Sequence, residues 1–345
     1  MNNGVNTNRI EWLDIARGIG LFCVILGHSV TTVIRENSSA AMWIYNTVYY
    51  FHMSLLFFIS GTAFGLKIEK YKKVQILDYI KDKAKRLLIP YVLYSFILFI
   101  IFSIANIVPG ISNKLVSSGY GKISFFEWLY QLLIGDNLYC QHLWYIYSLF
   151  ILSVLAFLSV RFFGRYFGII TVVLAIFINL MWSDSNRIAI IWKTAYVIVW
   201  FFAGAAIGLR KEMENRNKII LIILVPLMIL LRNRVPYYYG DTFYIPLRYV
   251  TLFVIIMAII AVSQLLSRLG SRPLVWLGRE SFPIYLFHQP FFGSGIGVVL
   301  YGILKLPIPI VIMISIVLSI FVPIGINSFI EKTNTKIGKM LIGKL

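Results

Sequence analysis

Hydrophobic and polar positions along this chain form long apolar runs separated by short polar or charged segments. An apolar run of about 20 residues is long enough to cross the hydrocarbon core of a bilayer as a helix. The pattern predicts about ten such helices and therefore an all-α, polytopic membrane protein. The expected spans are residues 12–33, 45–66, 87–108, 142–160, 166–183, 190–209, 218–232, 246–266, 282–303 and 308–329.

A shorter apolar segment lies in the longest gap between the predicted spans. Residues Phe125–Ile134 mix aromatic and polar side chains, which is typical of an amphipathic helix lying in the membrane interface. The chain shows no internal repeat, no low-complexity segment and no break in composition. We therefore expect a single transmembrane domain over residues 1–345.

Composition supports this class. The 345 residues are 59% hydrophobic and 13% charged, and the mean hydropathy is +0.81. A soluble domain cannot bury so much apolar surface. Cysteine is scarce, with only Cys23 and Cys140, and no Cys/His cluster has the spacing of a zinc site. We expect neither a disulfide framework nor a metal.

The net charge of +18 is distributed unevenly along the chain. If the N-terminus is cytoplasmic, the cytoplasmic segments carry 22 of the 32 Lys and Arg residues and the opposite side carries nine. This asymmetry follows the positive-inside rule and places both termini in the cytoplasm. The charge is thus mainly a topology signal, and we expect membrane lipids rather than nucleic acid as partners.

The first predicted helix carries three polar groups on one face. Arg17 and His28 are eleven residues apart, close to three turns of a helix, so their side chains share a face and lie about 16 Å apart along the axis. Asp14 precedes Arg17 by three residues and can pair with it. Ionisable groups at membrane depth are costly, so His28 and Arg17 are candidate functional residues.

Other polar residues also fall in or beside the spans. His52 suits a packing role as well as a catalytic one, and His142 opens a span together with Trp144, which is typical of an interfacial aromatic belt or of a sugar-stacking surface. Two prolines bracket the His288–Gln289 pair, as expected where a helix bends around a cavity. Lys83 and Arg86 are three residues apart on one helical face, so both can contact a phosphate.

These segments together resemble the acyltransferase 3 family of integral membrane O-acyltransferases. The family hallmark, Arg-x10-His in the first helix, matches Arg17 and His28. The opening IEWLDIARGIG resembles the fucose O-acetylase-like branch, whose members modify bacterial surface carbohydrates. Four further signatures occur in order: FHMSLLFFISG at 51–61, RLLIPY at 86–91, HLWY at 142–145 and ESFPIYLFHQP at 280–290.

The resemblance implies an enzyme of the bacterial plasma membrane that uses cytoplasmic acetyl-CoA as the acyl donor. The acceptor would be a hydroxyl of a lipid-linked or exported saccharide. His28 would act as general base or as a transient acyl carrier, while Arg17 and Arg86 bind the donor. Lys83 stands where the family often has arginine, so its donor role is less secure than that of Arg86. The expected acceptor-binding residues are His52, His142, Trp144, Glu280 and His288.

Two other functions are compatible with the residues alone. A polytopic transporter of a lipid-linked saccharide would use His28 in a proton relay, although no inverted repeat is evident. A haem-binding electron carrier would use two of the four histidines as axial ligands. The sequence leaves open the acceptor, the acyl chain length, the oligomeric state and the choice between direct transfer and an acyl-enzyme.

Overall fold

The computed structural model describes residues 10–163, 189–209, 223–230 and 245–344, together with the single positions 169 and 173. Within these ranges every regular element is a helix, which confirms the all-α class. Seven helical runs there are long and apolar enough to cross a membrane. Five of them are the single helices α1 (Glu11–Ser29), α3 (Ser39–Gly65), α11 (Ala189–Leu209), α13 (Ile245–Arg268) and α16 (Ile308–Thr333). The other two are composite: α5 (Ile76–Lys83) continues through η1 (Ala84–Leu88) into α6 (Ile89–Ala105), and η2 (Gln141–Leu143) continues through α9 (Trp144–Leu158) into η3 (Ser159–Phe163).

Two predicted spans are only partly covered by the described residues. These are 166–183 and 218–232, of which only 223–230 is described as a helical stretch. The count of ten and the cytoplasmic placement of both termini therefore stay predictions. The shorter helices are α2 (Thr32–Glu36), α4 (Ile68–Tyr71), α7 (Pro109–Ser117), α8 (Phe125–Ile134), α14 (Arg272–Arg279), α15 (Ser281–Phe287) and α17 (Lys336–Leu341).

Helix α8 has the boundaries expected from the sequence. It begins where the Ser124 hydroxyl accepts a hydrogen bond from the Glu127 main-chain N–H, at 3.1 Å. It ends at Gly135, whose φ of 71° is a left-handed conformation that glycine adopts without strain. The helix is confirmed, while its position in a membrane interface stays a prediction.

The segment predicted as one span over residues 282–303 is not one continuous helix. Helix α15 ends at Phe287, and two π-helical turns, η7 (Phe291–Gly295) and η8 (Val298–Ile303), follow after a break. Pro290 has no N–H to donate to a preceding carbonyl and restricts the residue before it, which favours a break in the helix at this point. The break is where the sequence predicts a bend, and it brings His288 beside α1.

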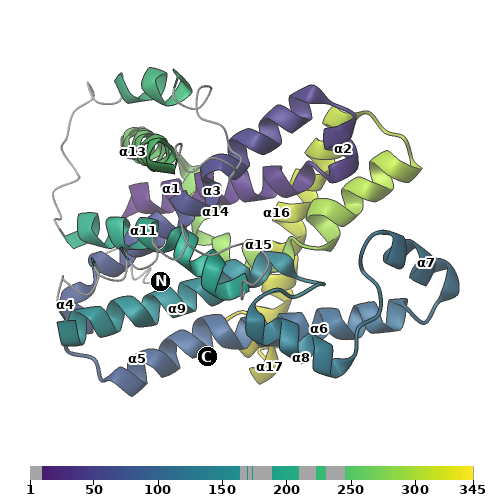
Figure 1. The fold of residues 1–345 in the computed structure, drawn as a ribbon, viewed down its shortest axis with the longest axis horizontal. Helices are drawn as coiled ribbons and strands as arrows, with labels where there is room; N and C mark the ends of the chain where they lie inside the picture. The colour runs from purple at the N-terminus through teal and green to yellow at the C-terminus, as the bar shows by residue number, and fades with distance from the viewer. Residues whose placement is uncertain are drawn as a thin grey trace.

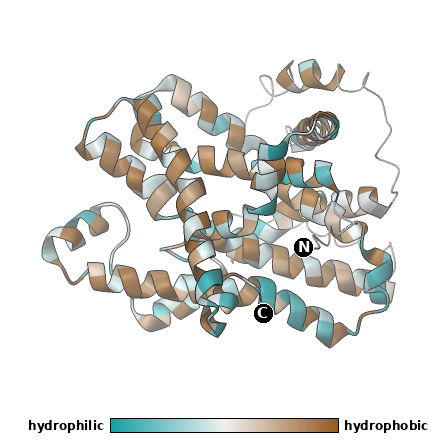
Figure 2. Cartoon of the chain, turned by 180° about the vertical axis from the view of Figure 1, so that it is seen from behind, coloured by the Kyte–Doolittle hydropathy of each residue, from teal (hydrophilic) through white to brown (hydrophobic). Residues whose placement is uncertain are grey.

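Helices α1, α3 and α6 run across the molecule, whereas α13 is seen end-on in this view (Figure 1). One end of the molecule holds α4 and α5, and the other holds α2 and α7. Figure 2 shows that α5 is mainly hydrophilic, whereas α6, its continuation, is mainly hydrophobic. The basic segment 67–86 thus lies at one end of a largely apolar bundle.

Helix α1 lies at the centre of this bundle. It packs against α3, α13, α14 and α16, and most of its side chains are buried. A Cβ atom added to Gly278 of α14 would collide with the main chain of Asp14, so the two backbones touch there. Gly18 makes the reciprocal approach toward α14, as expected for glycine at a helix contact in a membrane protein.

Candidate active site

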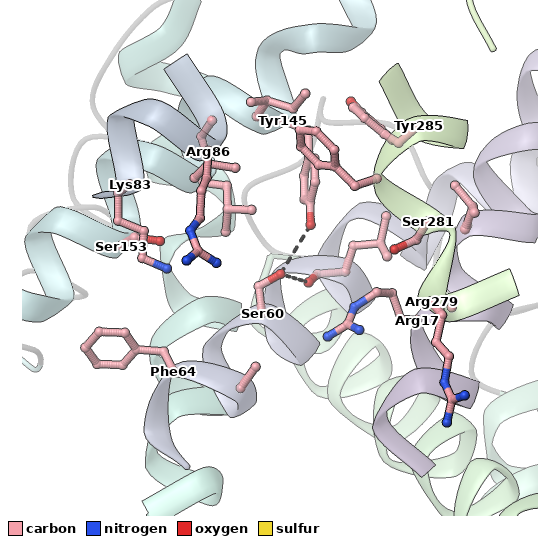
Figure 3. Close-up of a pocket in the computed structure, with 18 of the residues that line it drawn as sticks. Arg17, Ser60, Phe64, Lys83, Arg86, Tyr145, Ser153, Arg279, Ser281 and Tyr285 are labelled. Atoms are coloured by element: carbon pink, nitrogen blue, oxygen red, sulfur yellow. Dashed lines mark hydrogen bonds between the residues drawn. The ribbon is translucent and has the colours of Figure 1, made fainter. Parts of the chain in front are cut away.

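A cavity of about 390 Å³ opens between α1, α3, α9 and α14, and we call it the cationic cavity (Figure 3). Among the residues that the structure describes, its lining includes no Asp or Glu. Figure 3 shows Lys83 and Arg86 on one side of the cavity and Arg17 and Arg279 on the other. Within the described ranges, every charged group of the lining is therefore positive, and the remaining lining residues are hydroxyl-bearing or apolar. The cations in its lining are Arg17, Lys67, Lys83, Arg86 and Arg279.

Asp14 organises one side of the cationic cavity. Its carboxylate is 2% exposed, and Oδ1 accepts a hydrogen bond from Nη1 of Arg17 at 2.8 Å. Oδ2 lies 3.6 Å from Nε of Arg279. The predicted Asp14–Arg17 pair is confirmed. Because each guanidinium has five N–H donors in a planar fork, both arginines keep donors for a ligand.

Ser60 and Tyr145 lie between the two groups of cations that line the cavity (Figure 3). The Ser60 hydroxyl donates to the Leu56 carbonyl at 2.8 Å, and the two hydroxyl oxygens of Ser60 and Tyr145 are 3.2 Å apart. Since the single proton of Ser60 is used by the carbonyl, Tyr145 is the donor in that second contact. Among the described residues, the hydrogen-bond partners of Ser60 are this carbonyl and this hydroxyl, and neither is a base that would activate Ser60 as a nucleophile.

A second cavity of about 320 Å³, the histidine cavity, adjoins the first. Four predicted residues line it: His28, His52, His142 and Trp144. Tyr285 lines both cavities. On α1, Arg17 and Leu21 face the cationic cavity, and Val24 and His28 face the histidine cavity. The shared face predicted for Arg17 and His28 is confirmed, with the two side chains in neighbouring cavities.

Main-chain carbonyls fix the protons of three of the four histidines. Nδ1 of His52 lies 2.7 Å from the Val48 oxygen, Nδ1 of His288 lies 2.8 Å from the Tyr285 oxygen, and Nε2 of His142 lies 3.3 Å from the Leu286 oxygen. A carbonyl only accepts, so each of these nitrogens carries the proton and the other ring nitrogen of the neutral ring keeps a lone pair.

His28 differs from the other three histidines. Its nearest described partner is the Tyr49 hydroxyl, 3.5 Å from Nδ1, and that group can donate or accept. Neither tautomer of His28 is therefore excluded by a main-chain contact. The His28 ring is half-buried, and its geometry is compatible with a proton on either nitrogen.

Three imidazole rings come together from three distant segments. The ring centroid of His288 is 5.3 Å from that of His28 and 5.3 Å from that of His142. His288 has no exposed surface, and its Nε2 has no hydrogen-bond partner among the described residues. His288 thus lies behind His28 and lines none of the cavities described here. Its expected acceptor contact stays a prediction.

Comparison with protein families identifies the chain. A family model described as an acyltransferase domain, Acyl_transf_3, matches residues 10–328. The chain belongs to this family. It is therefore a multi-pass membrane acyltransferase, and the resemblance found in the motifs is confirmed at the level of the family. Neither the comparison with curated proteins nor that with solved structures found a match.

Several residues of this family member's site were not predicted. The motifs assign no role to Arg279, although it directly precedes the signature that begins at Glu280. Tyr49, Tyr145 and Tyr285 join the site only through tertiary contacts. Glu280, a predicted acceptor ligand, lines neither cavity, and its role stays a prediction.

Cys140 beside the histidine cluster is a structural thiol. It is 2% exposed, and Sγ donates to Oδ1 of Asn137 at 3.1 Å. Burial raises the pKa of the Cys140 thiol to about 12, so it is not a nucleophile at neutral pH. In the part of the chain that is described, no group of three or more His, Cys, Asp or Glu is placed to hold a metal ion.

Proposed function

We propose that this protein is an O-acyltransferase of the bacterial plasma membrane that transfers an acetyl group from cytoplasmic acetyl-CoA to a hydroxyl of a cell-surface or exported saccharide. One observation carries the proposal: a single face of α1 presents Arg17 to a cavity lined by cations and His28 to an adjoining cavity lined by histidines. Such an arrangement suits a long donor with phosphates at one end and a reactive thioester at the other.

The charge of the cationic cavity supports binding of the coenzyme. Coenzyme A carries a diphosphate and a further phosphate, and phosphates are bound best by arginine forks and lysine point charges. Arg17 and Arg279, held by Asp14, would contact one phosphate group. Arg86 and Lys83 stand across the cavity for another. The pantetheine arm would then extend along α1, past Tyr285, toward His28.

The chemistry at His28 is a simple acyl transfer. His28 accepts the proton of the saccharide hydroxyl as that oxygen attacks the thioester carbonyl. The carbon–sulfur bond breaks, coenzyme A leaves as a thiolate, and the proton returns from His28 to the sulfur. In the alternative route, a His28 nitrogen carries the acetyl group between two half-reactions. The lack of a main-chain partner on the His28 ring suits either route.

Several aromatic residues in the lining of the histidine cavity are suited to binding a saccharide. Trp144, Trp192 and Tyr196 line it, and flat rings of this kind stack on the apolar faces of sugars. His52 and His142 each keep a lone pair that can accept a hydrogen bond from a sugar hydroxyl. These contacts would hold the acceptor while His28 takes its proton.

Acetyl transfer in membranes tests this function. Membranes from cells that make the protein would be supplied with radiolabelled acetyl-CoA, and label in the extracted glycan would be counted. We expect His28→Ala to lower the transfer rate by about 10²–10⁴-fold, the usual contribution of a general base. Cys23→Ala, on the same helix but in none of the three cavities, should leave the rate unchanged.

Two results would contradict the proposal. If His28→Ala transferred acetyl groups normally but stopped glycan export, a transporter with a histidine proton relay would explain the protein better. A Soret band in the spectrum of the purified protein would favour a haem carrier.

A further inference from the structure

A third cavity, of about 450 Å³, lies beside α2 and is separate from the donor site. We call it the α2 cavity. It shares His28 and Tyr49 with the histidine cavity and shares no lining residue with the cationic cavity. His28 therefore lies between two cavities, only one of which shares a lining residue with the cationic cavity. A two-substrate reaction needs such a second approach to its base.

The walls of the α2 cavity are aromatic and hydroxyl-bearing. Phe102 stacks on Tyr120, with ring centroids 5.4 Å apart and planes 24° apart. Phe291 continues the row, 6.1 Å from Phe102 and within 11° of its plane. Hydroxyl groups of Thr31, Thr32, Ser118 and Ser294 also belong to the lining. Parallel rings beside hydroxyl groups are suited to a carbohydrate chain, which presents apolar faces and polar edges.

Arg35 is the cation of this cavity, and the lining includes no carboxylate. Its guanidinium donates to the Thr32 hydroxyl at 2.9 Å and lies 3.9 Å from the centre of the Tyr45 ring. These two contacts orient the group and leave most of its five donors unused. Among the described residues, no Asp or Glu forms an ion pair with Arg35. An oriented, uncompensated guanidinium is suited to a phosphate or a carboxylate.

We propose that the α2 cavity binds the acceptor and selects a saccharide that carries an anionic group. The anionic group binds Arg35, and the adjoining sugars lie against Phe102, Tyr120 and Phe291. The saccharide chain then passes His28 and Tyr49, which line both cavities, so that its acetylated ring lies in the histidine cavity against the aromatic residues proposed above to hold it. This inference rests on the proposed function and specifies its substrate class. The anion is either the phosphate of a lipid-linked saccharide or the carboxylate of an acidic sugar, since the two share the same chemistry at Arg35.

Two variants test the cavity by different means. Arg35→Gln removes the charge, and we expect the transfer rate at limiting acceptor to fall about tenfold, while Arg35→Lys retains part of it. Ser118→Trp fills the cavity from an exposed rim position and should lower transfer as strongly. The matched controls are Lys114→Gln, an exposed cation on the neighbouring helix α7, and Ser117→Trp, an exposed residue outside the lining. Both should transfer like wild type.

Donor binding separates this inference from the proposed function. Equilibrium binding of acetyl-CoA to the purified full-length protein should be unchanged in Arg35→Gln and Ser118→Trp, because neither residue lines the cationic cavity. If both variants transferred acetyl groups at the wild-type rate, the assignment of this cavity would be overturned. If wild-type protein neither bound acetyl-CoA nor transferred acetyl groups, the proposed function itself would fail.

Competition identifies the source of the anion. A polyprenyl phosphate and a glucuronate oligosaccharide would each be added to the membrane assay as an inhibitor. Inhibition by one of them that weakens in Arg35→Gln supports the inference and names the group. Inhibition that is the same in wild type and Arg35→Gln, for both compounds, contradicts it.

Discussion

The two ends of α1 hold their polar side chains in different ways. At Arg17 the cations stay partly exposed, and the buried carboxylate of Asp14 is shared by two guanidinium groups. At His28 the neighbouring imidazoles are buried, and main-chain carbonyls fix the protons of His52, His142 and His288. One cavity concentrates positive charge, while the lining of the other is mainly imidazole and aromatic groups, with Lys193 paired to Asp136 at its edge.

This difference shows how one helix can serve both halves of a transfer reaction. Exposed cations bind and release a polyanion readily because water still solvates them. A buried imidazole is useful only if its donors are satisfied, because an unpaired buried polar group costs about 1–3 kcal/mol. The carbonyl partners meet that need without adding a charge. Substitutions at each end should therefore change different kinetic constants.

The largest effect on donor binding is expected from the contact between α1 and α14. Gly278→Ala places a Cβ atom against the main chain of Asp14, so α14 must move and carry Arg279 away from Arg17. We expect the affinity for acetyl-CoA to fall by at least about tenfold, as one charge-assisted contact is worth about 1.5 kcal/mol or more. Equilibrium binding to the purified protein measures it.

Gly325→Ala is the matched control for that substitution. Gly325 also lies within a helix, α16, but nothing stands within 4 Å of its added Cβ atom. Equal acetyl-CoA affinity in the two variants would show that the close approach of α1 and α14 does not position the cations.

A smaller effect is expected at the opposite side of the cationic cavity. Arg86→Gln removes a lining cation whose exposed guanidinium also pairs with Asp82 at 2.9 Å. Because it is well solvated, we expect the KM for acetyl-CoA to rise only about fivefold with kcat nearly unchanged. The neighbouring Lys85 is equally exposed but lines no cavity described here, so Lys85→Gln should have no effect. A similar rise in both variants would point to general surface charge instead.

The smallest effect is expected beside His28. Tyr49→Phe removes the hydroxyl 3.5 Å from Nδ1 and leaves the ring in place. This distance is long for a hydrogen bond, so we expect kcat to fall only about threefold, with the KM for acetyl-CoA unchanged. Steady-state kinetics in membranes measures both constants. A change confined to the KM for acetyl-CoA would mean that Tyr49 belongs to the donor site rather than to the proton-transfer step.

Much of the cationic side was predictable because its pattern is local. Asp14 and Arg17 are one helical turn apart, as are Lys83 and Arg86, so helix periodicity alone places each pair on one face. Arg279 was not predicted because its partner, Asp14, is distant in the chain. The two residues come close only because Gly278 allows the backbones of α1 and α14 to touch. No periodic signal marks such a contact.

The histidine side was predictable only as a set of candidates. The sequence shows that His28, His52, His142 and His288 fall near spans, but their depth depends on packing. His288 was expected to contact the acceptor, yet it has no exposed surface and lies against His28. The break in the helix before Pro290 places His288 beside His28. A hydropathy pattern does not predict such a break, because it reports the length of an apolar segment and not the path of its backbone.

The sequence by itself determined the membrane class, the shared face of Arg17 and His28 and the family, because each depends on composition, on the helical repeat or on short motifs. Only the tertiary structure decided that these two residues face separate, adjoining cavities, that Asp14 also contacts Arg279, and that a third cavity reaches His28 beside Arg35. Cavities form between helices that are distant in the chain, and their shape is set by side-chain packing among all of them rather than by any one segment.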